Sequence, residues 1–449
     1  MRMTFYGGVK VVTGANYLVE SGDTRILIDC GMHQGSNFCE KHNFEPFPYE
    51  PKSINAVFIT HAHIDHIGRL PKLHRDGFRG AVYSTPPTRD FSELMLIDSE
   101  HIIIEDAKKF KKEPIYNIQS VNDIMSVWEG IPYHTPVRVG PFTVTLYNAG
   151  HILGSSLILV EADGKKVLFS GDLGNSPAPI IGNTETLSDA DAVVVESTYG
   201  NRIHEPSDTR KEALEDAIED TVRNSGVLMI PAFAMERTQE LLFEINNLAE
   251  QGRIPRVPIF IDSPLAIKLT GVYKKYEMYF DEATRVMIGR GDAIFNFPGL
   301  HTTLTTEESK TINDVPPPKV VIAGSGMSNG GRILHHEARY LPDPNSTIIF
   351  VGYQSMGTLG RAILDGAKEV KIFGEKVSVR CKVQAIPAYS AHADQPQLLA
   401  WLAPLRESAK IVFVVQGEGE ASKALAQKIK DELALSAVIP EERKSYDIL

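Results

Sequence analysis

Short apolar runs separated by tight turns dominate the beginning of the chain. Residues 16–20 and 25–30 are predicted to pair as one hairpin, and residues 157–162 and 165–172 as another. In the second hairpin Asp163 and Gly164 suit a two-residue turn. Because helical patterns follow several of these strands, the alternation predicts an α/β or αββα layered architecture.

From about residue 201 strands alternate regularly with amphipathic helices. Helices are predicted over 207–226 and 236–252, where apolar residues recur at helical spacing. The strands between such helices, such as VLMIPAF and KVVIAGSG, are of the buried type. This pattern predicts a separate lobe with a parallel sheet, after which the chain returns through 373–394 to a short terminal α/β segment.

Polar side chains follow several of the apolar strands at the point where each strand ends. Asp29 follows RILI, Asp172 follows VLFSG, and Glu196 follows AVVV. His151 comes after TVTLYNAG in the same manner. We therefore expect one shared edge of the fold at which these side chains converge.

The segment HAHIDH at 61–66 contains four side chains that commonly bind metal ions, His61, His63, Asp65 and His66. One tetrahedral ion cannot use all four, so the segment favours two ions, one taking His61 and His63. Two adjacent metal ions activate water and stabilise a displacement at phosphorus. The alternative, a histidine-rich surface loop, is less favoured because the segment joins a predicted strand (56–60) to a predicted helix (67–73), a position typical of functional groups.

Composition narrows the classes of protein that the chain can belong to. Its 449 residues predict two to three domains, and 43% hydrophobic with 23% charged residues is ordinary for a soluble protein. No apolar run approaches the roughly 20 residues of a membrane span, and the N-terminus lacks the apolar core of a signal peptide. We therefore expect no membrane partner.

The cysteines and the net charge refine this picture. Cys30, Cys39 and Cys381 are odd in number and have no C-x-x-C spacing, which argues against a disulfide framework and favours a cytoplasmic location. The net charge of −11 argues weakly against a polyanionic partner, although metal cations can reverse the local sign at a site.

Together the motifs resemble the β-CASP branch of the metallo-β-lactamase fold. The first set consists of Asp29, HAHIDH, His151 in NAGHILGS and Asp172 in FSGDLG; the second consists of VESTYG (195–200), GSGMSNGGR (324–332) and SAHAD (390–394). This branch includes the endonuclease subunit of the cleavage and polyadenylation specificity factor and prokaryotic RNA-processing relatives. The resemblance implies an α/β fold, namely an αββα sandwich (1–200 and 387–449) into which a β-CASP α/β domain (201–386) is inserted.

The resemblance also implies a role for each matching residue. The first zinc ion would bind His61, His63 and His151, the second would bind Asp65 and His66, and Asp172 would bridge the two. Asp29 would hold a ligand histidine in its tautomer from behind. His392 would protonate the leaving oxygen, Glu196 would orient it, and Asp65 would contribute to catalysis as well as to metal binding.

One position departs from the pattern. RNA-cleaving relatives usually have a histidine in a strand-end motif like VHGE, which completes the second zinc site. The matching stretch here is FVVQGEGE, with Gln416 in place of that histidine. Gln416 is expected to be a weak ligand through its carbonyl oxygen, so the second zinc ion should bind more loosely. DNA-cleaving members of the branch also lack the histidine.

The glycine-rich segment 324–332 follows a strand and precedes a helix. Its backbone N–H groups, together with Ser325, Gly326, Ser328 and Arg332, are predicted to bind a phosphate. The alternative is a turn whose glycines only allow close packing. The resemblance favours the phosphate site.

These observations predict a Zn²⁺-dependent phosphodiesterase that cleaves single-stranded RNA internally, with trimming from the 5′ end as a further mode. Gln416 keeps a DNA nuclease as one alternative. A subunit of an RNA-processing complex that has kept the fold with weakened catalysis is the other. Assembly as a homodimer stays open.

Overall fold

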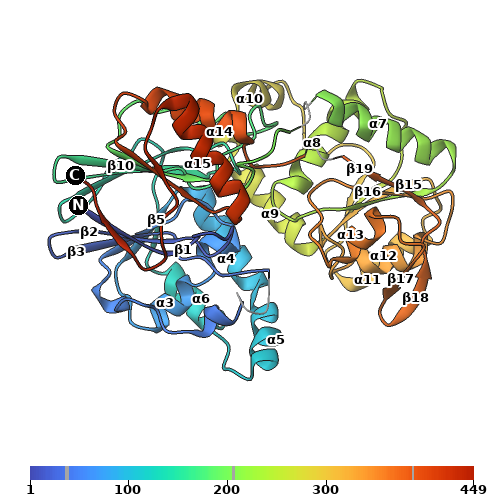
Figure 1. Cartoon of the computed structure of the whole chain (residues 1–449). Coiled ribbons are helices and arrows are strands. Elements are labelled where there is room, and N and C mark those ends of the chain that lie inside the picture. The colour runs from blue at the N-terminus through green and yellow to red at the C-terminus, as the bar shows by residue number, and fades with distance from the viewer. Residues whose placement is uncertain (36–39, 205–207, 387–388) are drawn as a thin grey trace. The chain divides into compact units, whose positions relative to one another are not determined.

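The computed structural model describes residues 1–35, 40–204, 208–386 and 389–449. The chain divides into a first unit, Met1–Ile203 with His392–Leu449, and a second unit, His204–Ala391 (Figure 1). The predicted domain limits, after 200 and after 386, lie near these breaks. Residues 387–388 at the second limit, and Cys39, lie outside the described residues. In the described part of the chain, no helix has the length and apolarity that crossing a bilayer requires.

Two seven-stranded sheets form the centre of the first unit. The first sheet contains, in spatial order, β22 (Ser445–Asp447), β1 (Arg2–Gly7), β2 (Asn16–Ser21), β3 (Thr24–Ile28), β4 (Ala56–Phe58), β5 (Ala81–Ser84) and β6 (Trp128–Gly130). The second contains β21 (Ala437–Val438), β20 (Ile411–Val415), β11 (Ala192–Glu196), β10 (Lys165–Phe169), β9 (Ser156–Ala162), β8 (Phe142–Asn148) and β7 (Val137–Val139). Both predicted hairpins are confirmed, because β2 pairs antiparallel with β3, and β9 with β10.

The central strands of the first unit are largely apolar because both faces of each sheet are buried there. In β4, Phe58 packs between the sheets while Val57 packs against the outer helices. In β10, Phe169 points inward and Leu168 outward in the same alternation. Successive side chains at the centre of these strands therefore alternate between two apolar environments.

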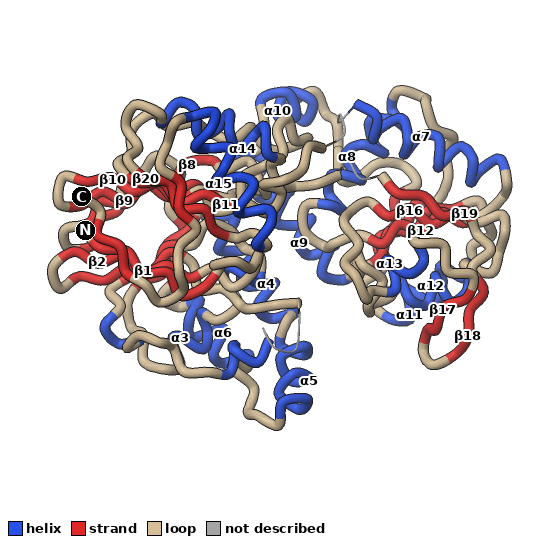
Figure 2. The backbone as a smooth tube through the Cα atoms, in the orientation of Figure 1, coloured by secondary structure: helices blue, strands red, loops and turns tan. Residues whose placement is uncertain are grey.

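Helices cover the outer face of each sheet of the first unit (Figure 2). The first sheet is covered by α2 (Ile64–Ile67), α3 (Leu70–Arg75), α4 (Pro86–Asp98), α5 (Glu100–Phe110) and α6 (Ile118–Met125). The second is covered by α14 (Gln395–Leu402) and α15 (Gly419–Leu433). The order helix, sheet, sheet, helix confirms the predicted αββα sandwich.

The second unit is built on a six-stranded sheet in which every paired strand is parallel. The spatial order is β14 (Leu300–Thr302), β13 (Ile259–Asp262), β15 (Lys319–Ala323), β12 (Val227–Pro231), β16 (Thr347–Phe350) and β19 (Lys382–Ala385). Its helices are α7 (Asp208–Arg223), α8 (Arg237–Glu250), α9 (Pro264–Lys275), α10 (Glu282–Gly289), α11 (Thr306–Thr311), α12 (Ile333–Tyr340) and α13 (Leu359–Leu364). A small hairpin, β17 (Glu369–Ile372) with β18 (Glu375–Ser378), completes it. The predicted α/β insertion is confirmed.

A buried ionic cluster anchors the last described residues of the second unit. Arg210 Nε donates to Glu244 Oε1 at 2.8 Å, and the Tyr389 hydroxyl donates to the other oxygen of Glu244. The guanidinium carbons of Arg210 and Arg237 each lie 5.3 Å from the centre of the Tyr389 ring. The cluster therefore fixes Tyr389, three residues before His392.

We predict that Arg210→Ala lowers the free energy of unfolding by about 3–5 kcal/mol, because it leaves the buried Glu244 carboxylate without its cation. Chemical denaturation followed by circular dichroism measures the change. Arg223→Ala is the matched control, since Arg223 pairs with Asp220 while 69% exposed, and its removal should change stability by no more than about 0.5 kcal/mol. Equal stabilities of the two variants would contradict this assignment.

Candidate metal centre

The segments that follow β4, β8 and β10, together with the short helix α2, bring the predicted ligands of the first unit together. β4 leads into His61 and His63, α2 carries Asp65 and His66, and β10 leads to Asp172. Close backbone approaches require glycine here. A Cβ on Gly31 would lie 1.5 Å from the Asp65 carbonyl oxygen, and one on Gly174 would lie 1.8 Å from the carbonyl oxygen of Gly150, next to His151. The predicted convergence at one edge is therefore present.

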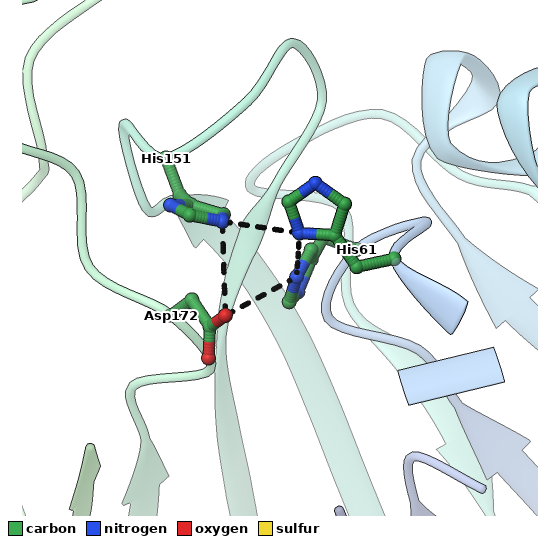
Figure 3. A group of neighbouring side chains, drawn as sticks. His61, His151 and Asp172 are labelled. Atoms are coloured by element: carbon green, nitrogen blue, oxygen red, sulfur yellow. Dashed lines mark hydrogen bonds and ion pairs between the residues drawn. The ribbon is translucent and has the colours of Figure 1, made fainter. Parts of the chain in front are cut away.

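His61, His63, His151 and Asp172 form a tight group with one potential ligand atom each (Figure 3). His61 Nε2 lies 3.0 Å from His63 Nδ1, and His151 Nε2 lies 3.3 Å from the same nitrogen. Asp172 Oδ2 lies 3.4 Å from His61 Nε2 and 3.6 Å from His151 Nε2. Zinc–nitrogen bonds of roughly 2.0–2.1 Å place tetrahedral ligands roughly 3.3 Å apart. The spacing thus fits a zinc ion.

The charge states in this group also suit a cation. Burial, and then the neighbouring His66, hold the pKa of His61 well below its usual range, and burial lowers the pKa of His63 to about 4. Burial opposes ionisation of Asp172, but His66 and His61 outweigh it and hold its pKa well below the usual range. Neutral imidazoles facing an ionised carboxylate are the donor set that zinc prefers.

The second predicted position is organised around His66. Its Nδ1 lies 2.7 Å from Asp29 Oδ2, while Asp29 also accepts from the Thr60 backbone N–H and hydroxyl, each at 2.8 Å. Its Nε2 lies 3.4 Å from Asp172 Oδ1 and 3.9 Å from Asp65 Oδ2. Burial lowers the pKa of His66, but Asp172 and Asp29 outweigh it and raise that pKa well above the usual range. Asp29 thus makes the contact that its predicted supporting role requires.

Gln416 lies beside His66, but with the opposite orientation to the one expected from the sequence. Its amide nitrogen, not its carbonyl oxygen, faces the site, donating to Asp172 Oδ1 at 2.9 Å and lying 2.9 Å from His66 Nε2. The oxygen accepts from the Tyr17 hydroxyl at 3.3 Å. Burial and then the nearby carboxylates raise the pKa of Tyr17 well above its usual range, so the hydroxyl keeps its proton. A carboxylate acceptor on one side and a hydroxyl donor on the other account for this orientation.

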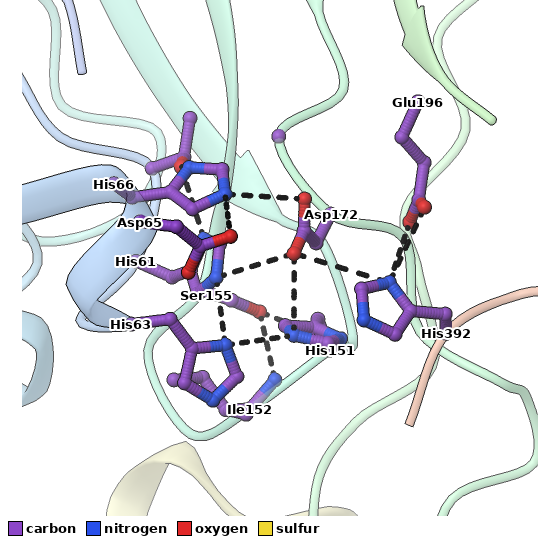
Figure 4. Close-up of polar contacts among 12 residues, drawn as sticks. His61, His63, Asp65, His66, His151, Ile152, Ser155, Asp172, Glu196 and His392 are labelled. Atoms are coloured by element: carbon purple, nitrogen blue, oxygen red, sulfur yellow. Dashed lines mark hydrogen bonds and ion pairs between the residues drawn. The ribbon is translucent and has the colours of Figure 1, made fainter. Parts of the chain in front are cut away.

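His392 and Glu196 lie next to the first group (Figure 4). His392 Nδ1 is 3.2 Å from both oxygens of Glu196 and 3.9 Å from Asp172 Oδ2. Glu196 is held by the backbone N–H of Leu173, which donates at 2.6 Å. Burial lowers the pKa of His392, but Glu196 outweighs it and raises the pKa to about 9. The structure therefore brings the predicted proton donor and its orienting acid together.

The predicted phosphate-binding residues lie in the second unit, where their side chains have partners of their own. Ser325 Oγ accepts from the Asn329 backbone N–H at 3.0 Å, and Ser328 is buried with its hydroxyl donating to Glu337. The carbonyl oxygen of Gly326 accepts from Gln354 Nε2 at 2.9 Å. Backbone N–H groups of the turn are also engaged, since Ser325 donates to Gly330 and Ser328 to Ser325, so the phosphate role of this segment stays a prediction.

Arg332 is likewise engaged within the second unit. Its Nη1 donates to Asp262 Oδ1 at 2.8 Å and to the carbonyl oxygen of Thr303 at 2.9 Å, and its Nη2 donates to that of Leu304 at 3.0 Å. Asp262 is fully buried and also binds His336 Nε2 at 2.7 Å. A phosphate role for Arg332 stays a prediction and requires it to exchange these partners.

Two residues at the metal centre were not predicted from the sequence. Thr60 donates to Asp29 and lies 3.1 Å from both His61 Nδ1 and His66 Nδ1, and its only signal is its place directly before HAHIDH. Tyr17 lies in the middle of β2, far along the chain from Gln416, and carries no local signal at all.

We predict that Glu337→Gln raises stability much more at pH 8.5 than at pH 5. Burial raises the pKa of Glu337 to about 8, so the folded chain keeps this proton while the unfolded chain releases it at lower pH. Stability should therefore fall as the pH rises from the ordinary range of a glutamate to about 8. The variant keeps an acceptor for Ser328 without a titrating group. Unfolding midpoints at both pH values measure the difference.

Glu375→Gln, at an exposed position, is the control and should shift both midpoints equally. A Glu337→Gln variant with the same pH dependence as the wild-type chain would show that Glu337 ionises normally in the folded state.

Comparison with family models gives three matches along the chain. The metallo-beta-lactamase superfamily matches residues 9–198, the Beta-Casp domain matches 238–363, and the Zn-dependent metallo-hydrolase RNA specificity domain matches 376–440. The first and third matches fall mainly in the two segments of the first unit, and the second falls within the second unit.

Full-length relatives are also found. The chain is 39% identical to ribonuclease TTHA0252 of Thermus thermophilus over 95% of both chains. It is 31% identical to an RNase J-like protein of Methanocaldococcus jannaschii, over 98% of this chain and 97% of that one. It is also 31% identical to the transcription termination factor FttA of Methanosarcina mazei, over 97% of this chain and 70% of that one. A crystal structure of a protein of unknown function from Enterococcus faecalis shares the fold, with a TM-score of 0.60, 13% identity and 99% coverage of both chains.

Proposed function

We propose that this chain, which belongs to the β-CASP branch of the metallo-β-lactamase superfamily, hydrolyses phosphodiester bonds in single-stranded RNA. Membership confirms the resemblance identified from the motifs and the expected class, a hydrolase of the nuclease type. The RNA substrate is supported by the RNA specificity match over 376–440 and by relatives named as ribonucleases. Internal cleavage and trimming from the 5′ end are both included in the proposal.

The observation that carries the proposal is the group of His61, His63, His151 and Asp172. Four ligand atoms lie within 4.8 Å of one another, and tetrahedral zinc suits both their spacing and their chemistry. A zinc ion held by these residues would activate a water molecule and neutralise charge that develops on the phosphate. Asp29 contacts His66, and the Thr60 hydroxyl donates to Asp29. Both residues thereby keep the surrounding side chains in place.

Proton delivery is assigned to His392. Glu196 faces its Nδ1 with both carboxylate oxygens, which fixes the ring and favours its protonated form. A protonated imidazole beside the metal ligands can donate to the oxygen that leaves when the phosphodiester bond breaks. Asp65, on the other side of Asp172, remains the third predicted catalytic residue.

Two alternative functions are distinguished from this one by the experiment described below. Gln416, in the place of a histidine, favours a DNA nuclease of the same branch as the second candidate. A non-catalytic subunit is disfavoured, because the four ligands of the first position and the pair His392 and Glu196 are all in place.

The experiment compares labelled single-stranded RNA and DNA of equal sequence, incubated with the purified zinc-loaded chain. We expect cleavage of RNA in preference to DNA. Preferential cleavage of DNA would favour the alternative nuclease, and cleavage of neither would favour the non-catalytic subunit.

We predict that His392→Ala lowers the rate of RNA cleavage about 10²–10⁴-fold, the usual effect of losing a positioned general acid. Zinc content, measured by elemental analysis, should stay unchanged because His392 is not a proposed ligand. Glu196→Gln should act in the same direction but more mildly. Asp172→Ala is the contrasting variant and should lose both zinc and activity.

Loss of a zinc ion from His392→Ala would contradict the assignment. Asp172, Glu196 and His392 also place ligand atoms within 4.8 Å of one another, so His392 would then be a metal ligand and the acid would be another residue.

A further inference from the structure

Gln416 is fixed at the metal centre by its backbone. It follows β20 with φ of 47°, its backbone N–H donates to the Gly8 carbonyl oxygen at 2.7 Å, and its own carbonyl oxygen accepts from the Thr198 hydroxyl at 3.2 Å. Only 2% of the residue is exposed. Its side chain therefore cannot withdraw to solvent and must find its partners inside the site.

The amide of Gln416 contacts the two atoms that a second zinc ion would need most. Asp172 Oδ1 accepts from its nitrogen at 2.9 Å, and His66 Nε2 lies 2.9 Å from the same nitrogen. His66 Nδ1 faces Asp29, so a zinc ion could bind His66 only through Nε2. The Gln416 amide nitrogen lies against this Nε2 and against Asp172 Oδ1, so the amide and the ion compete for the same position.

Tyr17 holds the amide in this orientation. Its hydroxyl donates to Gln416 Oε1 at 3.3 Å, and the tyrosine is 3% exposed. To serve as a zinc ligand, Gln416 would have to turn its oxygen toward His66 and Asp172. Its NH₂ group would then face the Tyr17 hydroxyl, which would lose the acceptor that its proton now has.

We propose that the chain binds a single zinc ion tightly, at His61, His63, His151 and Asp172, and that the Gln416 amide, held by Tyr17, takes the place of the second ion. The inference rests on the proposed function for the first zinc site. It makes the amide group of Gln416 the group that donates to Asp172 Oδ1 and lies against His66 in the second position. The two-metal arrangement expected from the motifs is thereby reduced to one metal ion and one amide.

Zinc stoichiometry tests the proposal without any measurement of activity. The full chain is stripped with a chelator, titrated with zinc in competition with a chromophoric chelator, and checked by elemental analysis. We expect one tightly bound equivalent in the wild-type chain and two in Gln416→His. Histidine tolerates positive φ and offers a ring nitrogen in place of an amide.

Tyr17→Phe provides a second test that leaves Gln416 in place. Without the hydroxyl the amide is able to turn, so the second equivalent of zinc should bind roughly tenfold more tightly than in the wild-type chain. Tyr116→Phe is the matched control, since Tyr116 is a buried tyrosine of the first unit whose hydroxyl donates to the Leu96 carbonyl oxygen instead. It should leave zinc binding unchanged.

Two tight equivalents in the wild-type chain would overturn the proposal, and so would a single equivalent in Gln416→His together with unchanged binding in Tyr17→Phe. If Gln416→His fails to fold, the nearly isosteric Gln416→Glu, which also supplies a ligand atom, decides the point by the same count. If no variant binds zinc tightly, the result would instead contradict the first zinc site and the proposed function that rests on it.

Discussion

Asp172 lies where the buried strand β10 ends, and its two oxygens face different partners. Oδ2 lies 3.4 Å from His61 and 3.6 Å from His151, whereas Oδ1 lies 3.4 Å from His66 and accepts from Gln416. One carboxylate, 4% exposed, thus links both predicted metal positions and lies close to His392. Burying a carboxylate is unfavourable unless positive charge or hydrogen-bond donors surround it, so the histidines and the amide around Asp172 depend on one another.

The sandwich explains how these side chains come together. Because both faces of each sheet are buried at its centre, the central strands are largely apolar, and the polar side chains of the site follow where these strands end. Asp29 and Asp172 follow the ends of β3 and β10, β11 ends at Glu196, and the short helix α2 presents Asp65 and His66 to the same region. Local rules of this kind are visible in the sequence, which is why the fold class, the family and the convergence of the ligand residues could be predicted from it.

Other features depend on partners that no local pattern reveals. The orientation of Gln416 is set by Tyr17, 399 residues earlier in the chain. Arg332 was expected to meet a phosphate, but it pairs with Asp262, 70 residues upstream, in the second unit. Neither partner is part of a recognisable motif, and each becomes a partner only once the chain has folded. The motifs therefore predict which residues gather at the site. They do not predict which hydrogen-bond partners the side-chain atoms of Gln416 and Arg332 have.

We propose that His61, His63, His151 and Asp172 hold the metal ion that the chemistry requires. Anomalous diffraction at the zinc edge from crystals of the zinc-loaded chain tests it most directly. On this proposal we expect one strong peak within bonding distance of these four side chains and none of comparable strength between His66 and Gln416. A strong peak bound by Glu196 and His392, or two equal peaks on either side of Asp172, would contradict it.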